Sequence, residues 1–359
     1  FEESLPLETL FGYRYGAFVL EVLPEVEAGT LLGYVTADGT FSRGAESVAC
    51  DELFALYEKK LENVYPTQAP AENIPMETFS APEADRRAPA VKTARPRVLI
   101  PVFPGTNCEY DSARAMTDAG AEAQIMVLNN RTADGIARSV EHFAQALRDA
   151  QMVFIPGGFS GGDEPDGSGK FITAFFRNAA VKEEVTALLE RRDGLMCGIC
   201  NGFQALIKLG LVPYGRIIDT DASCPTLTFN TIARHQSRIV RVRVASNRSP
   251  WLAATQVGDV YSVPISHGEG RFLVDEALIR QLAANGQIAT QYVDLDGRAT
   301  DDIHFNPNGS LFAVEGITSP DGRVFGKMGH AERMGAGLYK NVPGEYDMKM
   351  FTSAVRYFR

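Results

Sequence analysis

The sequence predicts an α/β protein whose mostly parallel sheet carries helices on both faces, with a small α+β segment before it. From Arg97 onward, continuous apolar runs alternate with helical patterns, which is typical of strands buried on both faces of a parallel sheet. A proline-rich stretch with little apolar periodicity separates this region from the first 65 residues. We therefore expect three parts, namely residues 1–65, a linker at 66–96 and the α/β domain at 97–359.

The first part is short for an independent core. Two apolar runs, AFVLEV and LLGYV, predict strands, and CDELFALYEKKLENVY predicts a helix. A domain of this size is marginally stable unless something supports it. The chain opens at Phe1 without a methionine. These features favour either the severed end of a larger domain or a small docking module.

Four apolar runs in the third part predict the parallel strands, and a helical pattern follows three of them. Active sites in such sheets lie at the carboxyl ends of the strands. Three of the loops that follow the strands have unusual sequences. The strands are RVLIPVF, AQIMVL, QMVFIPGGF and GLMCGIC, and the unusual loops are FPGTNCEYD, IPGGFSGGDEPDGSG and GICNGFQ.

Composition excludes several classes of protein. The net charge of −10 argues against a protein that grips nucleic acid by neutralising phosphates. No apolar run approaches the roughly 20 residues of a spanning helix, so no membrane partner is expected. Five irregularly spaced cysteines do not resemble a disulfide framework. We expect a reducing, cytoplasmic location.

Cys200 stands between two glycines in GICNG, the form of a strand-to-helix nucleophile elbow. The helix that follows would favour the thiolate, and the Asn201 amide could donate to an oxyanion. A buried structural cysteine is the alternative interpretation of the same motif. Cys197, inside the apolar strand, is expected to pack as a small hydrophobe. Cys108 also begins a helix at a strand end, so it competes for the role of nucleophile.

A cysteine nucleophile needs a base, and GHAER supplies the best candidate among five histidines. His330 and Glu332 are two residues apart, so in extended chain both side chains point to the same side. The carboxylate can then orient the imidazole, which completes a Cys–His–Glu arrangement. An ordinary surface pair is the alternative.

The loop IPGGFSGGDEPDGSG can serve as an oxyanion hole, because glycines let backbone N–H groups turn toward a ligand. A phosphate cradle is the lesser interpretation, since the loop matches neither common phosphate-binding pattern. Asp163, Glu164 and Asp166 also disfavour an anionic ligand there.

Residues 97–350 resemble the class I glutamine amidotransferases, and specifically the glutaminase portion of the large, single-chain phosphoribosylformylglycinamidine synthases. The motifs that carry the resemblance are PGTNCEYD, PGGFSGGD, GICNGFQ, SHGEGRF, NPNGS and GHAER. The N-terminal FGYRYGAFVLEV resembles the tail of that enzyme's synthetase half. The chain is thus identified as a C-terminal fragment of such an enzyme.

The resemblance implies the chemistry and the roles of the residues. Glutamine would be hydrolysed to glutamate and ammonia through a thioester on Cys200, with His330 as general base and acid and Glu332 as the orienting carboxylate. The ammonia would serve purine biosynthesis in a synthetase half that uses ATP and Mg²⁺, whereas the glutaminase itself would need neither cofactor nor metal. The oxyanion hole would be formed by Gly157, Gly158, Phe159 and Asn201, and the candidates for substrate binding are Gln204, Asn230 and His267.

One position departs from the pattern. Many relatives have a proline before the catalytic histidine, where this chain has Gly329, so we expect a looser backbone there. Two other functions remain open at this point: a related thiol hydrolase such as a peptidase or a DJ-1-like protein, and a non-catalytic docking module.

Overall fold

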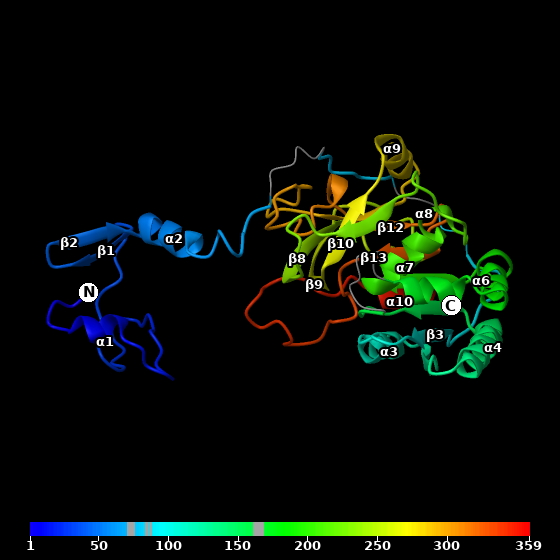
Figure 1. The fold of residues 1–359 in the computed structure, drawn as a ribbon, viewed down its shortest axis with the longest axis horizontal. Helices are drawn as coiled ribbons and strands as arrows, with labels where there is room; N and C mark the ends of the chain where they lie inside the picture. Colours follow the sequence, from blue (N-terminus) through cyan, green and yellow to red (C-terminus); the bar gives the residue numbers. More distant parts are fainter. Residues whose placement is uncertain (70–75, 83–85, 87, 161–168) are drawn as a thin grey trace. The chain divides into compact units, whose positions relative to one another are not determined.

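The computed structural model describes residues 1–69, 76–82, 86, 88–160 and 169–359. These divide into two compact units, Phe1–Gln68 and Ala69–Arg359. Figure 1 shows the helices and strands of each unit. No helix among these residues is both long and apolar enough to cross a membrane.

The first unit is a small α+β arrangement with little interior. Its two strands form an antiparallel hairpin, and neither of its helices has a buried residue. The expected strands AFVLEV and LLGYV are wrong, because neither run is part of a β-strand in this unit, and Phe18 and Leu20 are exposed. The elements are α1 (Leu7–Phe11), β1 (Thr40–Arg43), β2 (Glu46–Ala49) and α2 (Cys50–Lys59).

Part of the proline-rich stretch belongs to the second unit and packs on the rest of it. Phe79 is buried, and its amide donates to Gln291 Oε1 at 2.8 Å. The Ala81 amide donates to the Ala245 carbonyl at 2.8 Å. These contacts attach residues 79–81 to the larger unit, where the sequence suggested an extended linker.

The second unit is built on a nine-stranded sheet in the order β4-β3-β5-β6-β13-β12-β11-β8-β9. Its first half is parallel, as the apolar runs predict: β3 pairs with β4 and β5, and β6 pairs with β5 and β13. The second half, from β12 to β9, is antiparallel. The strands of this sheet are β3 (Arg97–Val102), β4 (Glu122–Val127), β5 (Met152–Ile155), β6 (Leu195–Ile199), β8 (Gln236–Val244), β9 (Val260–His267), β11 (Ile288–Tyr292), β12 (Val314–Thr318) and β13 (Val324–Lys327). A separate two-stranded sheet joins β7 (Thr226–Phe229) to β10 (Glu269–Leu273).

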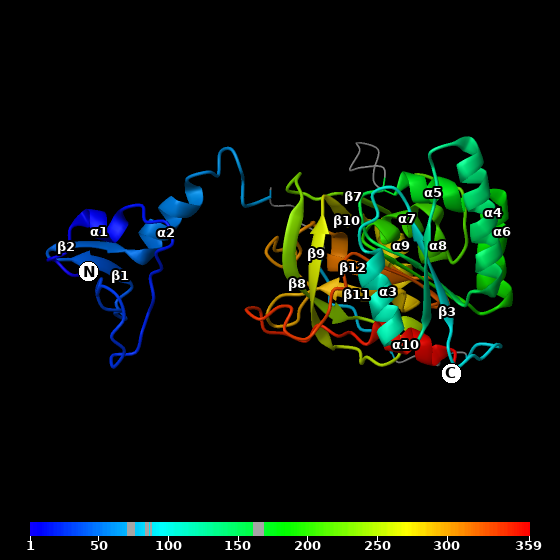
Figure 2. The same ribbon diagram turned by 90° about the horizontal axis from the view of Figure 1, so that it is seen from below.

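Helices cover the parallel half in two groups. In the first group α6 contacts both α4 and α5, and α5 contacts α7; in the second group α3 contacts α10 (Figure 2). The long helical pattern at 170–192 divides in two, because Asn178 caps a new helix by accepting from the Ala180 amide. The helices are α3 (Glu109–Asp118), α4 (Ala133–Asp149), α5 (Lys170–Phe176), α6 (Ala179–Arg191), α7 (Asn201–Leu209), α8 (Leu211–Tyr214), α9 (Glu276–Ala284) and α10 (Met350–Tyr357), with short 3₁₀ turns at Pro250–Leu252 and Leu311–Ala313.

Candidate active site

Cys200 lies in a strained turn between β6 and α7. Its φ of 51° and ψ of −105° place a non-glycine residue in a sparsely populated region, which is how active sites often store strain. Both flanking glycines are required by close contacts. A Cβ on Gly198 would lie 2.5 Å from the Gly202 carbonyl carbon, and one on Gly202 would lie 2.1 Å from the Ile155 oxygen. The glycines therefore let the helix approach the sheet and lift the thiol at its N-terminus.

His330 and Glu332 follow the neighbouring parallel strand, so they lie at the same edge of the sheet as Cys200. In the pairing of β13 with β6, Lys327 stands opposite Ile199, and the Cys200 amide donates to the Lys327 carbonyl at 2.9 Å. His330 Nδ1 lies 2.6 Å from Glu332 Oε1, and both side chains are buried. The predicted imidazole–carboxylate pair is thus formed in this structure.

The electrostatics of this pair favour an ionised carboxylate. Burial alone would raise the pKa of Glu332, but the charge of His330 and its hydrogen bond outweigh burial and hold the pKa below its usual range. A carboxylate on Nδ1 keeps the proton on that nitrogen, which leaves Nε2 as the basic atom.

The thiol of Cys200 is held in its protonated form in the resting site. Burial raises its pKa, and Cys108 and Glu332 raise it further, whereas the Asn201 amide lowers it. The Cys200 sulfur itself lies 3.7 Å from the Ser266 carbonyl oxygen, to which it donates. A nearby base must therefore remove the proton before Cys200 can attack a substrate.

Cys108, the competing thiol, also lies at this site. Its sulfur is 3.7 Å from His330 Nδ1 and accepts from Arg333 Nη2 at 3.1 Å. Burial and then Glu332 raise the pKa of Cys108 to about 12, although Arg333 opposes them. The Cys108 sulfur and the Glu332 carboxylate both approach Nδ1 of His330. Cys108 is therefore poorly placed to transfer a proton to Nε2, the other ring nitrogen.

Cys108, His330 and Glu332 also offer ligand atoms that lie within 4.8 Å of one another. Thiolate, imidazole and carboxylate are all zinc ligands. The guanidinium of Arg333 already contacts the sulfur, however, and its positive charge opposes a metal ion there. The contacts therefore favour an acid–base role for the histidine and the carboxylate.

The glycine turn after β5 lies directly against the histidine. A Cβ on Gly157 would lie 2.6 Å from His330 Cε1 and 3.2 Å from Cys108 Sγ, so only glycine fits. Gly158 has a φ of 148°, which also favours glycine. The Phe159 amide donates to the Gly105 carbonyl at 2.8 Å, which argues against its use by an oxyanion. Asp163, Glu164 and Asp166 lie outside the described residues.

The Asn201 side chain links this turn to the helix behind the thiol. Its Oδ1 accepts from Ser160 Oγ at 2.6 Å, and its Nδ2 donates to Gln204 Oε1 at 2.9 Å. Gln204 in turn donates to the Glu269 carbonyl at 2.6 Å. Gln204, a candidate for substrate binding, is thus engaged in holding the site's framework.

Asn230 and His267, the other substrate-binding candidates, differ in the hydrogen bonds that their side chains make. Asn230 Nδ2 donates to the carbonyls of His267 and Arg234 at 2.9 and 3.0 Å. The His267 ring is buried against Gly270, and neither ring nitrogen has a hydrogen-bond partner among the described residues. Burial, followed by the charges of His330 and His235, lowers the pKa of His267 to about 3. Of the two, His267 is the one that retains unused hydrogen-bonding capacity.

Because the pKa of His267 is lowered in the folded protein, we expect the free energy of unfolding to decrease in mild acid. Below the ordinary histidine pKa of 6.5 the unfolded chain takes up a proton that folded His267 binds only near pH 3. Stability is therefore full above pH 6.5 and falls as the pH drops, by roughly 2–3 kcal/mol at pH 4.5. Urea unfolding of wild type and His267→Leu at pH 7 and pH 4.5 measures this difference. The leucine variant should lose correspondingly less stability, and the exposed-site control His304→Gln should behave as wild type. An equal loss in all three proteins would contradict this origin.

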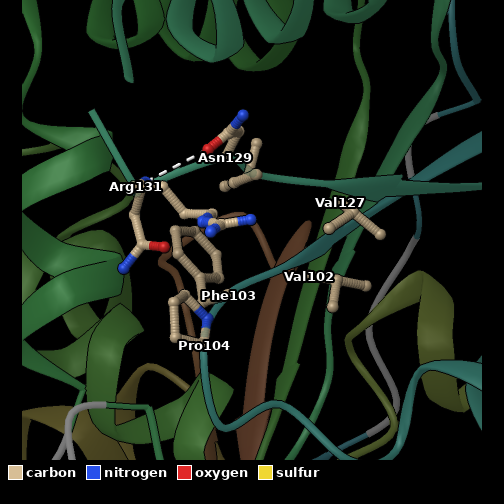
Figure 3. Close-up of a pocket in the computed structure, with 8 residues that line it drawn as sticks. Val102, Phe103, Pro104, Val127, Asn129 and Arg131 are labelled. Carbon is tan, nitrogen blue, oxygen red and sulfur yellow. Dashed lines mark hydrogen bonds between the residues drawn. The ribbon is translucent and has the colours of Figure 1, made fainter. Parts of the chain in front are cut away.

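A separate pocket opens at the carboxyl ends of β3 and β4. Figure 3 shows Phe103, Pro104 and Arg131 gathered around it, with the Arg131 amide bonded to Asn129 Oδ1 at 3.1 Å. Strand β5 stands between β3 and β6, so this pocket is distinct from the Cys200 site. It carries no nucleophile and no base, and its lining residues are Val102, Phe103, Pro104, Val127, Leu128, Asn129, Asn130 and Arg131.

Comparison with known proteins agrees with this geometry. Residues 95–358 match the family model described as a CobB/CobQ-like glutamine amidotransferase domain. The chain belongs to this family. The family confirms the predicted fold class, since the sheet combines a parallel half and flanking helices with the antiparallel extension described above.

The similar proteins indicate which member of the glutamine amidotransferase family this chain resembles. The phosphoribosylformylglycinamidine synthase subunit PurQ of Salinibacter ruber is 34% identical over 237 residues, which cover 66% of this chain and 87% of the relative. The subunit of the same name from Synechocystis is 33% identical over 261 residues, or 71% and 98% of the two chains. The structure of PurLQS from Thermotoga maritima aligns with a TM-score of 0.53 and 27% identity, covering 74% of this chain and 100% of that one. These matches confirm the prediction of a glutaminase component of this synthase.

Proposed function

We propose that this chain hydrolyses L-glutamine through a glutamyl thioester on Cys200. The observation that carries the proposal is that the strained turn at Cys200 and the buried His330–Glu332 pair follow adjacent parallel strands, at the same edge of the sheet. His330 takes the thiol proton as the sulfur attacks the carboxamide carbon, and then gives that proton to the departing ammonia. Water next attacks the thioester with His330 as base, which releases glutamate and restores the thiol.

Backbone amides stabilise the charge that develops on the carboxamide oxygen. The Asn201 amide favours negative charge at Cys200, and Gly158 turns its backbone beside the same site. We infer an oxyanion hole from these two residues, with Gly157 keeping the space next to the histidine clear. His267 is a candidate partner for the polar groups of glutamine, because its buried nitrogens have no other partner among the described residues.

The ammonia released from glutamine would be the substrate of a second reaction. We propose that a synthetase region uses it, with ATP and Mg²⁺, to convert formylglycinamide ribonucleotide into formylglycinamidine ribonucleotide, whereas the glutaminase half-reaction needs no cofactor. The PurLQS structure from Thermotoga maritima supports a synthetase partner. We further propose that residues 1–65 are the tail of that synthetase in one longer chain and that residues 66–96 connect the two. The five free cysteines are compatible with a cytoplasmic location.

Labelling with a chloroketone analogue of L-glutamine tests the nucleophile directly. We expect one adduct on Cys200 by peptide mass spectrometry, with protection by L-glutamine and a much slower reaction in His330→Ala. The enantiomeric chloroketone is the matched control and should label far more slowly. An adduct on Cys108 instead, or labelling that L-glutamine does not slow, would overturn the assignment.

A further inference from the structure

A fully buried ion pair lies beneath the candidate site. Lys327 ends β13, Glu315 belongs to the adjacent strand β12, and Lys327 Nζ lies 3.0 Å from Glu315 Oε1. Neither side chain is exposed to solvent. Removing two charges from water is costly, and apolar residues of similar volume often replace such pairs without loss of stability. Stability alone is therefore a weak explanation for this pair.

Both charged groups bind the residue that precedes the histidine. The Gly329 amide donates to Glu315 Oε1 at 2.6 Å, and Lys327 Nζ donates to the Gly329 carbonyl at 2.9 Å. The two peptide groups that flank the Gly329 Cα are thus fixed, one by each charge. Glycine has the most freedom of any residue, and these bonds remove that freedom at the point where the direction of His330 is set. These bonds restrain Gly329, where the sequence suggested a looser backbone.

The close approach of the carboxylate also requires glycine. A Cβ on Gly329 would lie 2.7 Å from Val263 Cγ1 and 2.9 Å from Glu315 Oε1. The second carboxylate oxygen accepts from the Thr290 hydroxyl, so both oxygens of Glu315 are held. The carboxylate that receives the Gly329 amide is therefore itself immobilised.

Lys327 contacts the backbone at Cys200 and the backbone that leads into His330. Its carbonyl accepts from the Cys200 amide at 2.9 Å, and its ammonium holds the peptide that leads into His330. One residue thus connects the backbone of the nucleophile to the backbone of the base. Movement of either group relative to the other would have to break one of these contacts.

We propose that Glu315 and Lys327 are positioning residues that hold His330 in the geometry needed to exchange a proton with Cys200. This inference rests on the proposed glutaminase function. A small misplacement of reacting groups, even by a distant change, can slow a reaction by about 100-fold. The pair should therefore act on the rate of chemistry rather than on substrate binding.

The double variant Glu315→Leu/Lys327→Met separates positioning from stability. Each single variant leaves one buried charge without its partner and should lower the melting temperature, whereas the double variant should recover most of that loss. Activity should not recover. We expect the double variant to have a kcat for glutamine about 10- to 100-fold below wild type, with KM within about twofold, and a shifted pH profile for alkylation of Cys200.

A buried polar residue remote from the site provides the matched control. Gln287 donates to the carbonyls of Pro213 and Thr318, at the far end of β12, so Gln287→Leu also removes buried polar contacts to backbone. It should lower the melting temperature and leave kcat near wild type. A double variant with recovered stability, wild-type kcat and an unshifted pH profile would overturn the proposal. Failure of the proposed function is a different result, namely undiminished hydrolysis by Cys200→Ala.

Discussion

Glutamine hydrolysis should disappear when Cys200 is replaced by alanine. The thioester cannot form without the sulfur, and the remaining groups can only orient water. We expect the rate of glutamate release to fall by at least about 10⁴-fold, the scale of losses on removal of a catalytic nucleophile. Glutamate measured by coupled oxidation, with and without L-glutamine, gives this rate for the wild-type chain and the variant.

Cys197→Ala is the matched control for this experiment. Cys197 lies within β6, three residues before Cys200, and burial raises the pKa of its thiol well above the usual value. Its replacement removes one buried sulfur without touching the elbow, so hydrolysis should stay within a few-fold of wild type. Equal rates for wild type and Cys200→Ala would remove the nucleophile from the proposal, and a dead Cys197→Ala variant would point to a folding defect.

Glu332→Gln should slow hydrolysis by roughly 10³- to 10⁴-fold, as an amide does in place of the carboxylate of a serine protease triad. The substitution keeps the size of the side chain while removing the charge that lies 2.6 Å from His330 Nδ1. An amide N–H facing Nδ1 would stabilise the opposite tautomer, whose proton sits on Nε2 and cannot accept one from Cys200.

Steady-state kinetics and the rate of chloroketone labelling both measure this effect. KM should change little, because Glu332 is fully buried and its carboxylate contacts the histidine. The melting temperature shows whether the variant remains folded. A folded Glu332→Gln protein that hydrolyses glutamine within tenfold of wild type would show that His330 does not depend on this carboxylate.

The parallel half of the fold could be predicted from local pattern alone. Buried parallel strands need apolar residues on both faces, so β3, β5 and β6 appear in the sequence as continuous apolar runs. The antiparallel half is harder to predict, because a strand such as β8 alternates arginines with buried valines and must pair with both β9 and the later strand β11. Its register depends on tertiary pairing that no single segment encodes.

In the first unit, the sequence predicts strands that do not form in the structure. AFVLEV has the composition of a strand, but a strand requires a neighbour to satisfy its backbone groups, and these residues pair with none within the described part of their unit. High β-propensity without a partner was therefore misleading. The hairpin Thr40–Ala49 formed where a glycine turn allowed two short segments to meet.

At the site, sequence spacing identifies the groups that a motif brings together locally. GICNG fixes its own geometry through contacts between its glycines and the sheet, and His-x-Glu places two side chains within reach of each other. Glu315 and Lys327 could not be found in this way, because their role depends on pairing between β12 and β13. Arg333 follows the motif directly, yet its contact with Cys108 joins residues from opposite ends of the domain.

The pairing of β6 with β13 has a consequence for the timing of biosynthesis. Met196 stands opposite Val324 in this pairing, so the strand that carries the thiol must wait for a segment made much later. Contacts between distant segments form slowly, and domains fold as their last strands become available. A ribosome-bound chain that stops before β13 would therefore hold Cys200 without its proposed base, and the proposed catalytic pair could form only after β13 has been made.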